Sequence, residues 1–139
     1  MIVLDTNVIS EIQGRRHSET ILRWLDGYDS EVVFLTAIAM AEIHFGIALL
    51  EPGTRRDGLH QTFARIENEF SGRILSFSPN VAARYGALSA RRQKEGRPME
   101  TKDAMIAAIC LSHDATLATR NTKDFEGLDL KLVNPFEEA

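Results

Sequence analysis

Three acidic residues occupy positions where their carboxylates could carry chemistry. Asp5 directly follows the short apolar run of residues 2–4. Glu42 lies in the largely apolar stretch 37–50, and a second such stretch follows Asp103. An ionised carboxylate among apolar side chains is costly unless it is paired or binds a cation. A carboxylate at the end of a buried parallel strand also lies where α/β proteins place their chemistry. The three acids together therefore suggest a site for a hard cation.

Each acid also has a purely structural interpretation. An Asp at the end of a strand often caps the helix that follows. Glu42 would then lie on a solvated stripe of its helix, and Asp103 would favour the positive end of its helix dipole. Both interpretations stay open for each residue taken alone, and the combination of the three favours the chemical one.

A fourth candidate region is the segment 119–125, Thr-Arg-Asn-Thr-Lys-Asp-Phe, which follows the apolar run 116–118. It contains one acid, Asp124, and one amide, Asn121, whose carbonyl could ligate weakly or hold a water. Either residue could complete the site.

The alternation of short apolar runs with longer amphipathic or apolar segments predicts an α/β fold whose parallel sheet is covered on both faces. Stretches 37–50 and 100–113 are apolar nearly all round, so we expect largely buried helices there. The predicted strands are 2–5, 32–35, 74–77, 116–119 and 131–133, and the predicted helices are 6–13, 19–27, 37–50, 55–70, 79–95 and 100–113. In this arrangement Asp5 and the Asn121 loop share the carboxyl edge of the sheet, where Glu42 and Asp103 can reach them from flanking helices.

Length and composition place the chain among ordinary globular proteins. Its 139 residues suit a single domain, 1–139, with one core. We expect no membrane association, since no apolar run has transmembrane length and no signal peptide opens the chain. A single cysteine, Cys110, lies in an apolar helix and suits a reducing cytoplasm. The net charge of −4 argues mildly against a nucleic-acid binder, although cations bound to the candidate acids would offset it.

The available ligands favour one kind of metal. The four histidines have no ligand spacing, so the site would use oxygen alone, which selects Mg²⁺ or Mn²⁺ over Zn²⁺. Such an ion can lower the pKa of a bound water and polarise a phosphodiester. The chain has neither a glycine-rich phosphate loop nor a Gly-x-Ser-x-Gly elbow, which disfavours nucleotide-triphosphate chemistry and serine hydrolysis.

Four motifs resemble, in order and spacing, those of PIN-domain ribonucleases, above all the VapC type and its FitB-like branch. They are Leu4-Asp5-Thr6-Asn7, Ala41-Glu42-Ile43, Lys102-Asp103-Ala104-Met105-Ile106-Ala107 and Ala118-Thr119-Arg120-Asn121-Thr122-Lys123-Asp124-Phe125. The resemblance implies a three-layer α/β/α fold with a short central parallel sheet. It also implies a Mg²⁺- or Mn²⁺-dependent endoribonuclease that acts as the toxin of a type II toxin–antitoxin pair. It maps Asp5, Glu42 and Asp103 onto the metal-binding acids, and Asp124 onto a further catalytic acid.

The resemblance further implies partners. It predicts an RNA substrate, an antitoxin protein from the same operon, a homodimer and a toxin–antitoxin hetero-oligomer. Around the acids, Thr6, Asn7, Thr119 and Asn121 could orient the carboxylates, although turns and caps also use these residue types. Arg120, Arg91 and Arg92 are candidate contacts for RNA or antitoxin, and for the last two a solvated helix end is the simpler interpretation.

Three other functions stay open at this point. A PIN nuclease could process RNA or cut DNA without being a toxin. A phospho-accepting receiver domain also gathers acids and Mg²⁺ at the edge of a parallel sheet, but it needs an acidic pair and a central-strand Asp that this chain lacks. A catalytically inactive binding module would be supported only by Asn121.

Overall fold

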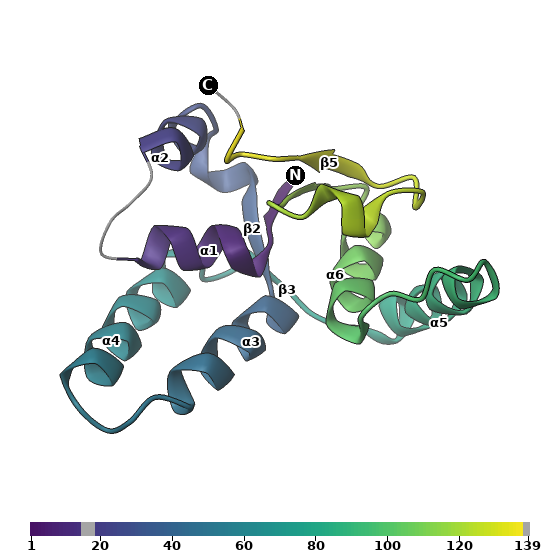
Figure 1. Cartoon of the computed structure of the whole chain (residues 1–139). Helices are drawn as coiled ribbons and strands as arrows, with labels where there is room; N and C mark the ends of the chain where they lie inside the picture. Colours follow the sequence, from purple (N-terminus) through teal and green to yellow (C-terminus); the bar gives the residue numbers. More distant parts are fainter. Residues whose placement is uncertain (15–18, 138–139) are drawn as a thin grey trace.

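Five short strands form one parallel sheet at the centre of the molecule (Figure 1). The computed structural model describes residues 1–14 and 19–137. The strand order is β3-β2-β1-β4-β5, and every neighbouring pair is parallel. The strands are β1 (Ile2–Leu4), β2 (Val33–Thr36), β3 (Ile74–Leu75), β4 (Thr116–Ala118) and β5 (Lys131–Val133).

In the part of the chain that the structure describes, six α-helices connect the strands, and two short 3-10 helices precede β2 and follow β4. The helices are α1 (Thr6–Gln13), α2 (Glu19–Asp26), η1 (Ser30–Val32), α3 (Ala37–Ala48), α4 (Thr54–Glu69), α5 (Pro79–Lys94), α6 (Thr101–Ser112) and η2 (Thr122–Phe125). The strands and α-helices end within two residues of the predicted positions. The sequence pattern did not predict the two 3-10 helices.

The two faces of the sheet are covered by different helices, which confirms the predicted α/β/α layers. Val3 and Leu117 point to one face and pack in a core with α5 and α6. Leu4 and Ala118 point to the other face and pack with α1, α3 and α4. This division follows from the alternation of side chains along a strand. Cys110 is fully buried in the first of these cores, as predicted.

The chain reverses its direction of winding beside β1. From β1 it continues to β2 and β3 on one side, and it then returns to β4 and β5 on the other side. At such a switch point the connections leave the carboxyl ends of two neighbouring strands in opposite directions, and a crevice opens between them. Asp5 directly follows β1 and Thr119 directly follows β4, so both lie at this crevice.

Helix α3 is less buried than its composition predicts. Ala39, Ile43 and Ile47 form its buried stripe, whereas Phe45 is 63% exposed and Leu49, at the end of the helix, is 69% exposed. The prediction of a largely buried helix was therefore wrong here, because α3 meets its neighbours along one side only. By contrast, α6 is buried from Ile106 to Cys110.

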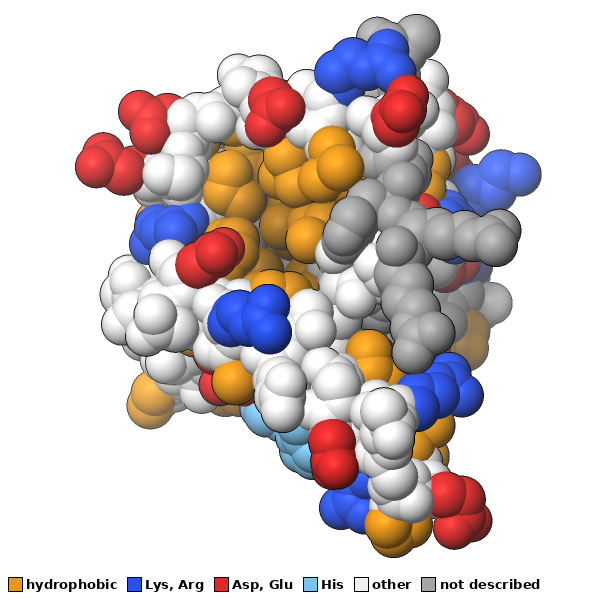
Figure 2. Space-filling model, turned by 90° about the vertical axis from the view of Figure 1, so that its left-hand side faces the viewer, with side chains coloured by type: hydrophobic (Ala, Val, Ile, Leu, Met, Phe, Trp, Pro, Cys, Tyr) orange, Lys and Arg blue, Asp and Glu red, His pale blue; other side chains and the backbone are white. Residues whose placement is uncertain are grey.

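A second apolar surface is visible on the side of the molecule that carries α1, α2 and α4. Figure 2 shows apolar side chains around a hollow on this side. A cavity of about 170 Å³ there is lined mainly by apolar side chains of α1, α2, α4 and the sheet, among them Ile9, Ile12, Leu25 and Ile66.

None of the helices among residues 1–14 and 19–137 has the length and apolar character needed to cross a bilayer.

Candidate active site

Asp5 lies at the centre of the crevice and is only 5% exposed. Its Oδ1 accepts a hydrogen bond from the Thr6 backbone N–H at 2.8 Å, so Asp5 does cap α1. Its Oδ2 accepts from the Thr119 hydroxyl at 2.7 Å and from Asn7 Nδ2 at 3.3 Å. Burial raises the pKa of Asp5, and these hydrogen bonds lower it only in part. The cap and the buried carboxylate are thus the same residue.

Asn7 and Thr119 tie the ends of β1 and β4 together. Asn7 Nδ2 also donates to Thr119 Oγ1 at 3.3 Å, and Asn7 Oδ1 accepts from the Arg120 backbone N–H at 3.1 Å. Thr119 Oγ1 accepts a further bond from the Asn121 N–H at 3.0 Å. This network holds the Asp5 carboxylate in one orientation, which is the arrangement expected of positioning residues.

Glu42 reaches the crevice from α3 and is bound on both oxygens. Its Oε1 accepts a hydrogen bond from the Thr6 hydroxyl at 3.2 Å. Its Oε2 lies 3.8 Å from Lys102 Nζ, at the start of α6. Lys102 is a partner of Glu42 that its position in the sequence does not reveal, since the only signal is its place directly before Asp103.

The pKa of Asp103 depends on the charges of the other candidate acids. Burial raises its pKa most, and the charges of Asp5, Glu100, Asp124 and Glu42 raise it further, to about 6. Carboxylates that repel one another in this way are within electrostatic reach, although they lie on four separate segments of the chain. The structure therefore brings the four predicted acids to one edge of the sheet.

The donor set suits a divalent cation of the hard type. All candidate ligands are carboxylate oxygens, and a cation between them would relieve the repulsion that Asp103 experiences. Within residues 1–14 and 19–137, no three His, Cys, Asp or Glu side chains already lie close enough together to hold a metal ion. The carboxylates nevertheless fit such an ion by their chemistry, since hard divalent cations take oxygen ligands.

Asp124 and Asn121, the two candidates to complete the site, lie in different surroundings. Asp124 lies on η2 and lines a cavity of about 370 Å³ together with Asp103, Glu100, Arg97 and Lys123. Asn121 is exposed and precedes η2 without a side-chain hydrogen bond to it. The shared cavity favours Asp124 as the fourth acid.

The three arginines proposed as RNA or antitoxin contacts have unequal surroundings. Arg120 is exposed and its guanidinium lies 3.8 Å from the ring centre of Phe136. Arg91 is exposed and donates to the Gly127 carbonyl at 2.9 Å. Arg92 is only 5% exposed, which contradicts its interpretation as part of a solvated helix end. It also lines the cavity that contains Asp103 and Asp124, so its contact with RNA or antitoxin stays a prediction.

The buried Arg92 instead connects two loops beside the acids. Its Nε donates to the Arg97 carbonyl at 2.9 Å, and its Nη1 donates to the Glu126 carbonyl at 3.2 Å. Arg97 precedes α6, which carries Asp103, and Glu126 follows η2, which carries Asp124. Sequence reasoning missed this role, because nothing in a run of basic residues shows which one turns inward.

Comparison with known proteins agrees with this arrangement. A model of the PIN domain matches residues 2–130. The plasmid stability protein StbB of Pseudomonas syringae is 41% identical over 138 residues, with 99% of both chains covered. The toxin FitB of Neisseria gonorrhoeae is 39% identical over 142 residues, covering 99% of this chain and 100% of FitB. The VapC ribonuclease Y4jK of Sinorhizobium fredii is 37% identical over 143 residues, with both chains covered completely.

Solved structures show the same fold. The crystal structure of FitAcB from Neisseria gonorrhoeae superposes with a TM-score of 0.91 at 39% identity and covers 99% of both chains. A toxin–antitoxin complex from Klebsiella pneumoniae superposes with a TM-score of 0.72 at 26% identity and covers both chains completely. Since the domain model spans most of the sequence and these relatives match it from end to end, the chain belongs to the PIN domain family.

Proposed function

We propose that this protein is a Mg²⁺- or Mn²⁺-dependent endoribonuclease that acts as the toxin of a type II toxin–antitoxin pair. The observation that carries the proposal is the group of four carboxylates at the switch point of the sheet, within which the pKa of Asp103 is raised to about 6. The names of the relatives support it, since one is a toxin and another a VapC ribonuclease.

The acids divide into ligands and supporting groups. Asp5, Glu42 and Asp103 would hold the cation, and Asp124 would assist them from η2. When bound, the ion lowers the pKa of a water and polarises the scissile phosphodiester. Thr6, Asn7 and Thr119 orient the Asp5 and Glu42 carboxylates through the hydrogen bonds described above. Carboxylate oxygens that remain free can accept the proton released by the attacking water.

The proposal includes an inhibitory partner. An active ribonuclease would harm its own cell, and one similar structure is a toxin–antitoxin complex. A basic antitoxin side chain, Arg above all, could pair with Asp5, Glu42 or Asp103 and keep the cation out. The apolar hollow of Figure 2 offers a partner additional contact area, because uncovered apolar surface commonly marks an interaction site.

We also propose a homodimer that binds antitoxin as a hetero-oligomer. The support is the uncovered side of α3, where Phe45 and Leu49 expose most of their surface. Symmetric dimers are the commonest way to cover such a surface.

Co-expression with the neighbouring small reading frame tests the toxin assignment. We expect the two proteins to co-purify on size exclusion as a complex that does not cleave RNA. Removing the partner should release ribonuclease activity that needs Mg²⁺ or Mn²⁺. An active protein that ignores the neighbouring product and accumulates harmlessly would refute the toxin role and favour a PIN nuclease of RNA processing. A protein that cleaves no RNA under any metal condition would refute the nuclease.

A further inference from the structure

A groove leads away from Glu42 between α1 and α3 and continues along the first half of α4. Its first part is a cavity of about 310 Å³, with Thr6 and Glu42 at the acidic end and Arg55 among the α4 residues that line it. A second cavity, of about 490 Å³, continues between the end of α1 and α4. The two cavities share Gln13, Gly14, Arg55 and Leu59, so they form one continuous groove.

The walls of this groove differ in character. Thr6, Ser10 and Gln13 line it at a spacing that places them on one face of α1. The rise from Thr6 to Gln13 is about 10 Å, so the groove extends well beyond the acids. On the α3 side, Gly46 leaves the groove open, because a Cβ placed there would meet nothing within 4 Å. Apolar side chains of Ile43, Ile47 and Leu59 complete the lining.

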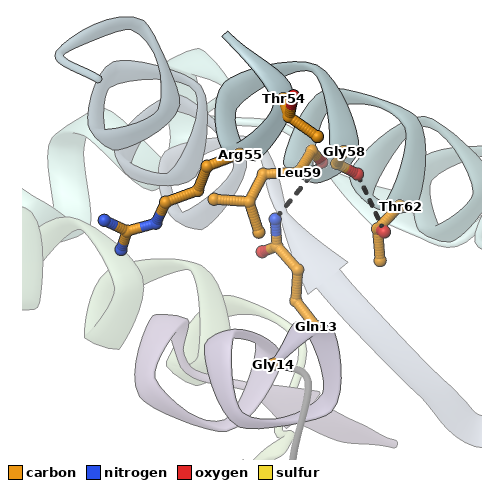
Figure 3. A pocket seen from close by; sticks show the side chains of 7 residues that line it. All are labelled: Gln13, Gly14, Thr54, Arg55, Gly58, Leu59 and Thr62. Carbon is orange, nitrogen blue, oxygen red and sulfur yellow. Dashed lines mark hydrogen bonds between the residues drawn. The ribbon is translucent and has the colours of Figure 1, made fainter. Parts of the chain in front are cut away.

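Arg55 places a free positive charge where the two cavities meet, away from Glu42. Its side chain is exposed, and it forms no hydrogen bond or ion pair within the part of the chain that the structure describes. Figure 3 shows the guanidinium extending from α4 away from Gln13, whose Nε2 instead donates to the Leu59 carbonyl at 3.4 Å. The groove thus has the Glu42 carboxylate at one end and an unengaged guanidinium at the junction of its two cavities.

We propose that the groove holds the single-stranded RNA substrate on one side of the cleaved bond, with Arg55 bound to a backbone phosphate of that flanking segment. This inference rests on the proposed ribonuclease function and names the path of its substrate. A guanidinium binds phosphate oxygens through two parallel hydrogen bonds, which suits a position that must fix the strand without reading its sequence. Unpaired bases and riboses can lie against the apolar wall, while Ser10 and Gln13 offer polar partners to the backbone.

Steady-state cleavage of a fluorescent RNA by Arg55→Ala tests the inference. Arg65→Ala is the matched control, because Arg65 is an exposed arginine of the same helix that lines neither cavity. We expect Arg55→Ala to raise KM about 5- to 10-fold with kcat nearly unchanged, which corresponds to one lost phosphate contact. The slope of log(kcat/KM) against log salt should become shallower by about 0.7, the value for one phosphate of a single strand. Arg65→Ala should match the wild type in both respects, and Arg55→Lys should restore most of the salt dependence.

Substrate length provides a second readout. RNAs truncated stepwise on either side of the cleavage site should become insensitive to Arg55→Ala once the segment that reaches Arg55 is removed. Equal KM and salt slope for Arg55→Ala and Arg65→Ala, or an effect that persists with the shortest RNA, would overturn the inference. If Arg55→Glu weakens only the binding of the antitoxin, the groove is a protein site and the RNA path is wrong.

Binding without cleavage separates this inference from the proposed function. In an Asp5→Asn background, anisotropy of the labelled RNA should show that Arg55→Ala weakens binding 5- to 10-fold, as in the kinetics. If the wild type cleaves RNA but Arg55→Ala leaves this affinity unchanged, the groove assignment alone fails. If the wild type neither cleaves nor binds RNA, the proposed function fails with it.

Discussion

The hydroxyl of Thr119 donates a 2.7 Å hydrogen bond to Asp5 Oδ2, across 114 positions of the chain. The bond joins the exits of β1 and β4, the neighbouring strands at which the winding of the sheet reverses. Thr119 Oγ1 also accepts from Asn7 and Asn121, so one buried hydroxyl serves three partners. The geometry of the central carboxylate therefore depends on a residue that is not itself an acid.

Thr119→Val should destabilise the protein and shift its activity to higher pH. Valine has nearly the same shape but leaves buried partners without their hydrogen bonds, which costs about 1–3 kcal/mol. Loss of the hydroxyl also removes the hydrogen bond that lowers the pKa of Asp5 most. Denaturant unfolding and a pH profile of RNA cleavage measure the two effects. Thr119→Ser keeps the hydroxyl and should resemble the wild type. Equal unfolding free energies and equal pH profiles for Thr119→Val and Thr119→Ser would contradict this role of the hydroxyl.

Asp103 should make the metal-free protein less stable as the pH rises. Its pKa is raised in the folded state from 3.8 to about 6, so the folded protein holds the proton more tightly than the unfolded chain. The resulting stabilisation is complete below pH 3.8 and is lost as the pH rises through about 6. Asp103→Asn cannot ionise, so its melting temperature relative to the wild type should be higher at pH 7 than at pH 4.

Melting curves in EDTA at pH 4 and pH 7 measure how the melting temperatures of Asp103→Asn and the wild type differ. Added Mg²⁺ should raise the melting temperature of the wild type at pH 7 and leave that of Asp103→Asn nearly unchanged. If the difference in melting temperature between Asp103→Asn and the wild type is the same at pH 4 and pH 7, Asp103 does not have the raised pKa.

Arg92 should matter for stability through its bonds to two loop carbonyls. Arg92→Met keeps most of the apolar volume but removes the bonds to the Arg97 and Glu126 carbonyls, and we expect a loss of about 2–4 kcal/mol. The loops before α6 and after η2 would then be less fixed, so RNA cleavage should also fall. The exposed neighbour offers a control, since Arg91→Met should change stability by less than about 0.5 kcal/mol. Similar unfolding free energies for the two variants would argue against the structural role of Arg92.

The apolar side of α3 should hold two copies of the chain together. Phe45 and Leu49 are exposed, so replacing both by Asp should leave the fold intact while placing charges in the proposed dimer interface. Light scattering after size exclusion should show a dimer for the wild type and a monomer for Phe45→Asp/Leu49→Asp. Leu22→Asp, on α2, is the control and should stay dimeric. A monomeric wild type, or a dimer that survives the double substitution, would rule out this interface.

Local sequence signals were sufficient for the positions of the strands and helices. Strand β1 ends just before Asp5 because a polar turn follows an apolar run, and α5 begins at Pro79 because proline suits the first turn of a helix. The acids could be chosen because charge in apolar surroundings is costly. Strand and helix positions depend mainly on neighbours in the chain, which is why these predictions were confirmed.

Other features depend on contacts between distant segments and could not be predicted in this way. The burial of Arg92 is decided by carbonyls at positions 97 and 126, and the exposure of Phe45 by the absence of a neighbour on one side of α3. The pairing of Lys102 with Glu42 likewise joins two helices. The strand order β3-β2-β1-β4-β5, which creates the crevice, was also not evident from the alternation of elements.

Cleavage of RNA by the wild type and by Asp5→Asn, each assayed with Mg²⁺ and with EDTA, tests the central claim most directly. Asp5→Asn changes the charge of the buried carboxylate but keeps its shape, so circular dichroism should show an unchanged fold. We expect the partner-free wild type to cleave RNA with Mg²⁺ or Mn²⁺ and to stop with EDTA. Asp5→Asn should be inactive under every condition. Activity that survives both EDTA and Asp5→Asn would contradict a mechanism that depends on a cation held by these acids.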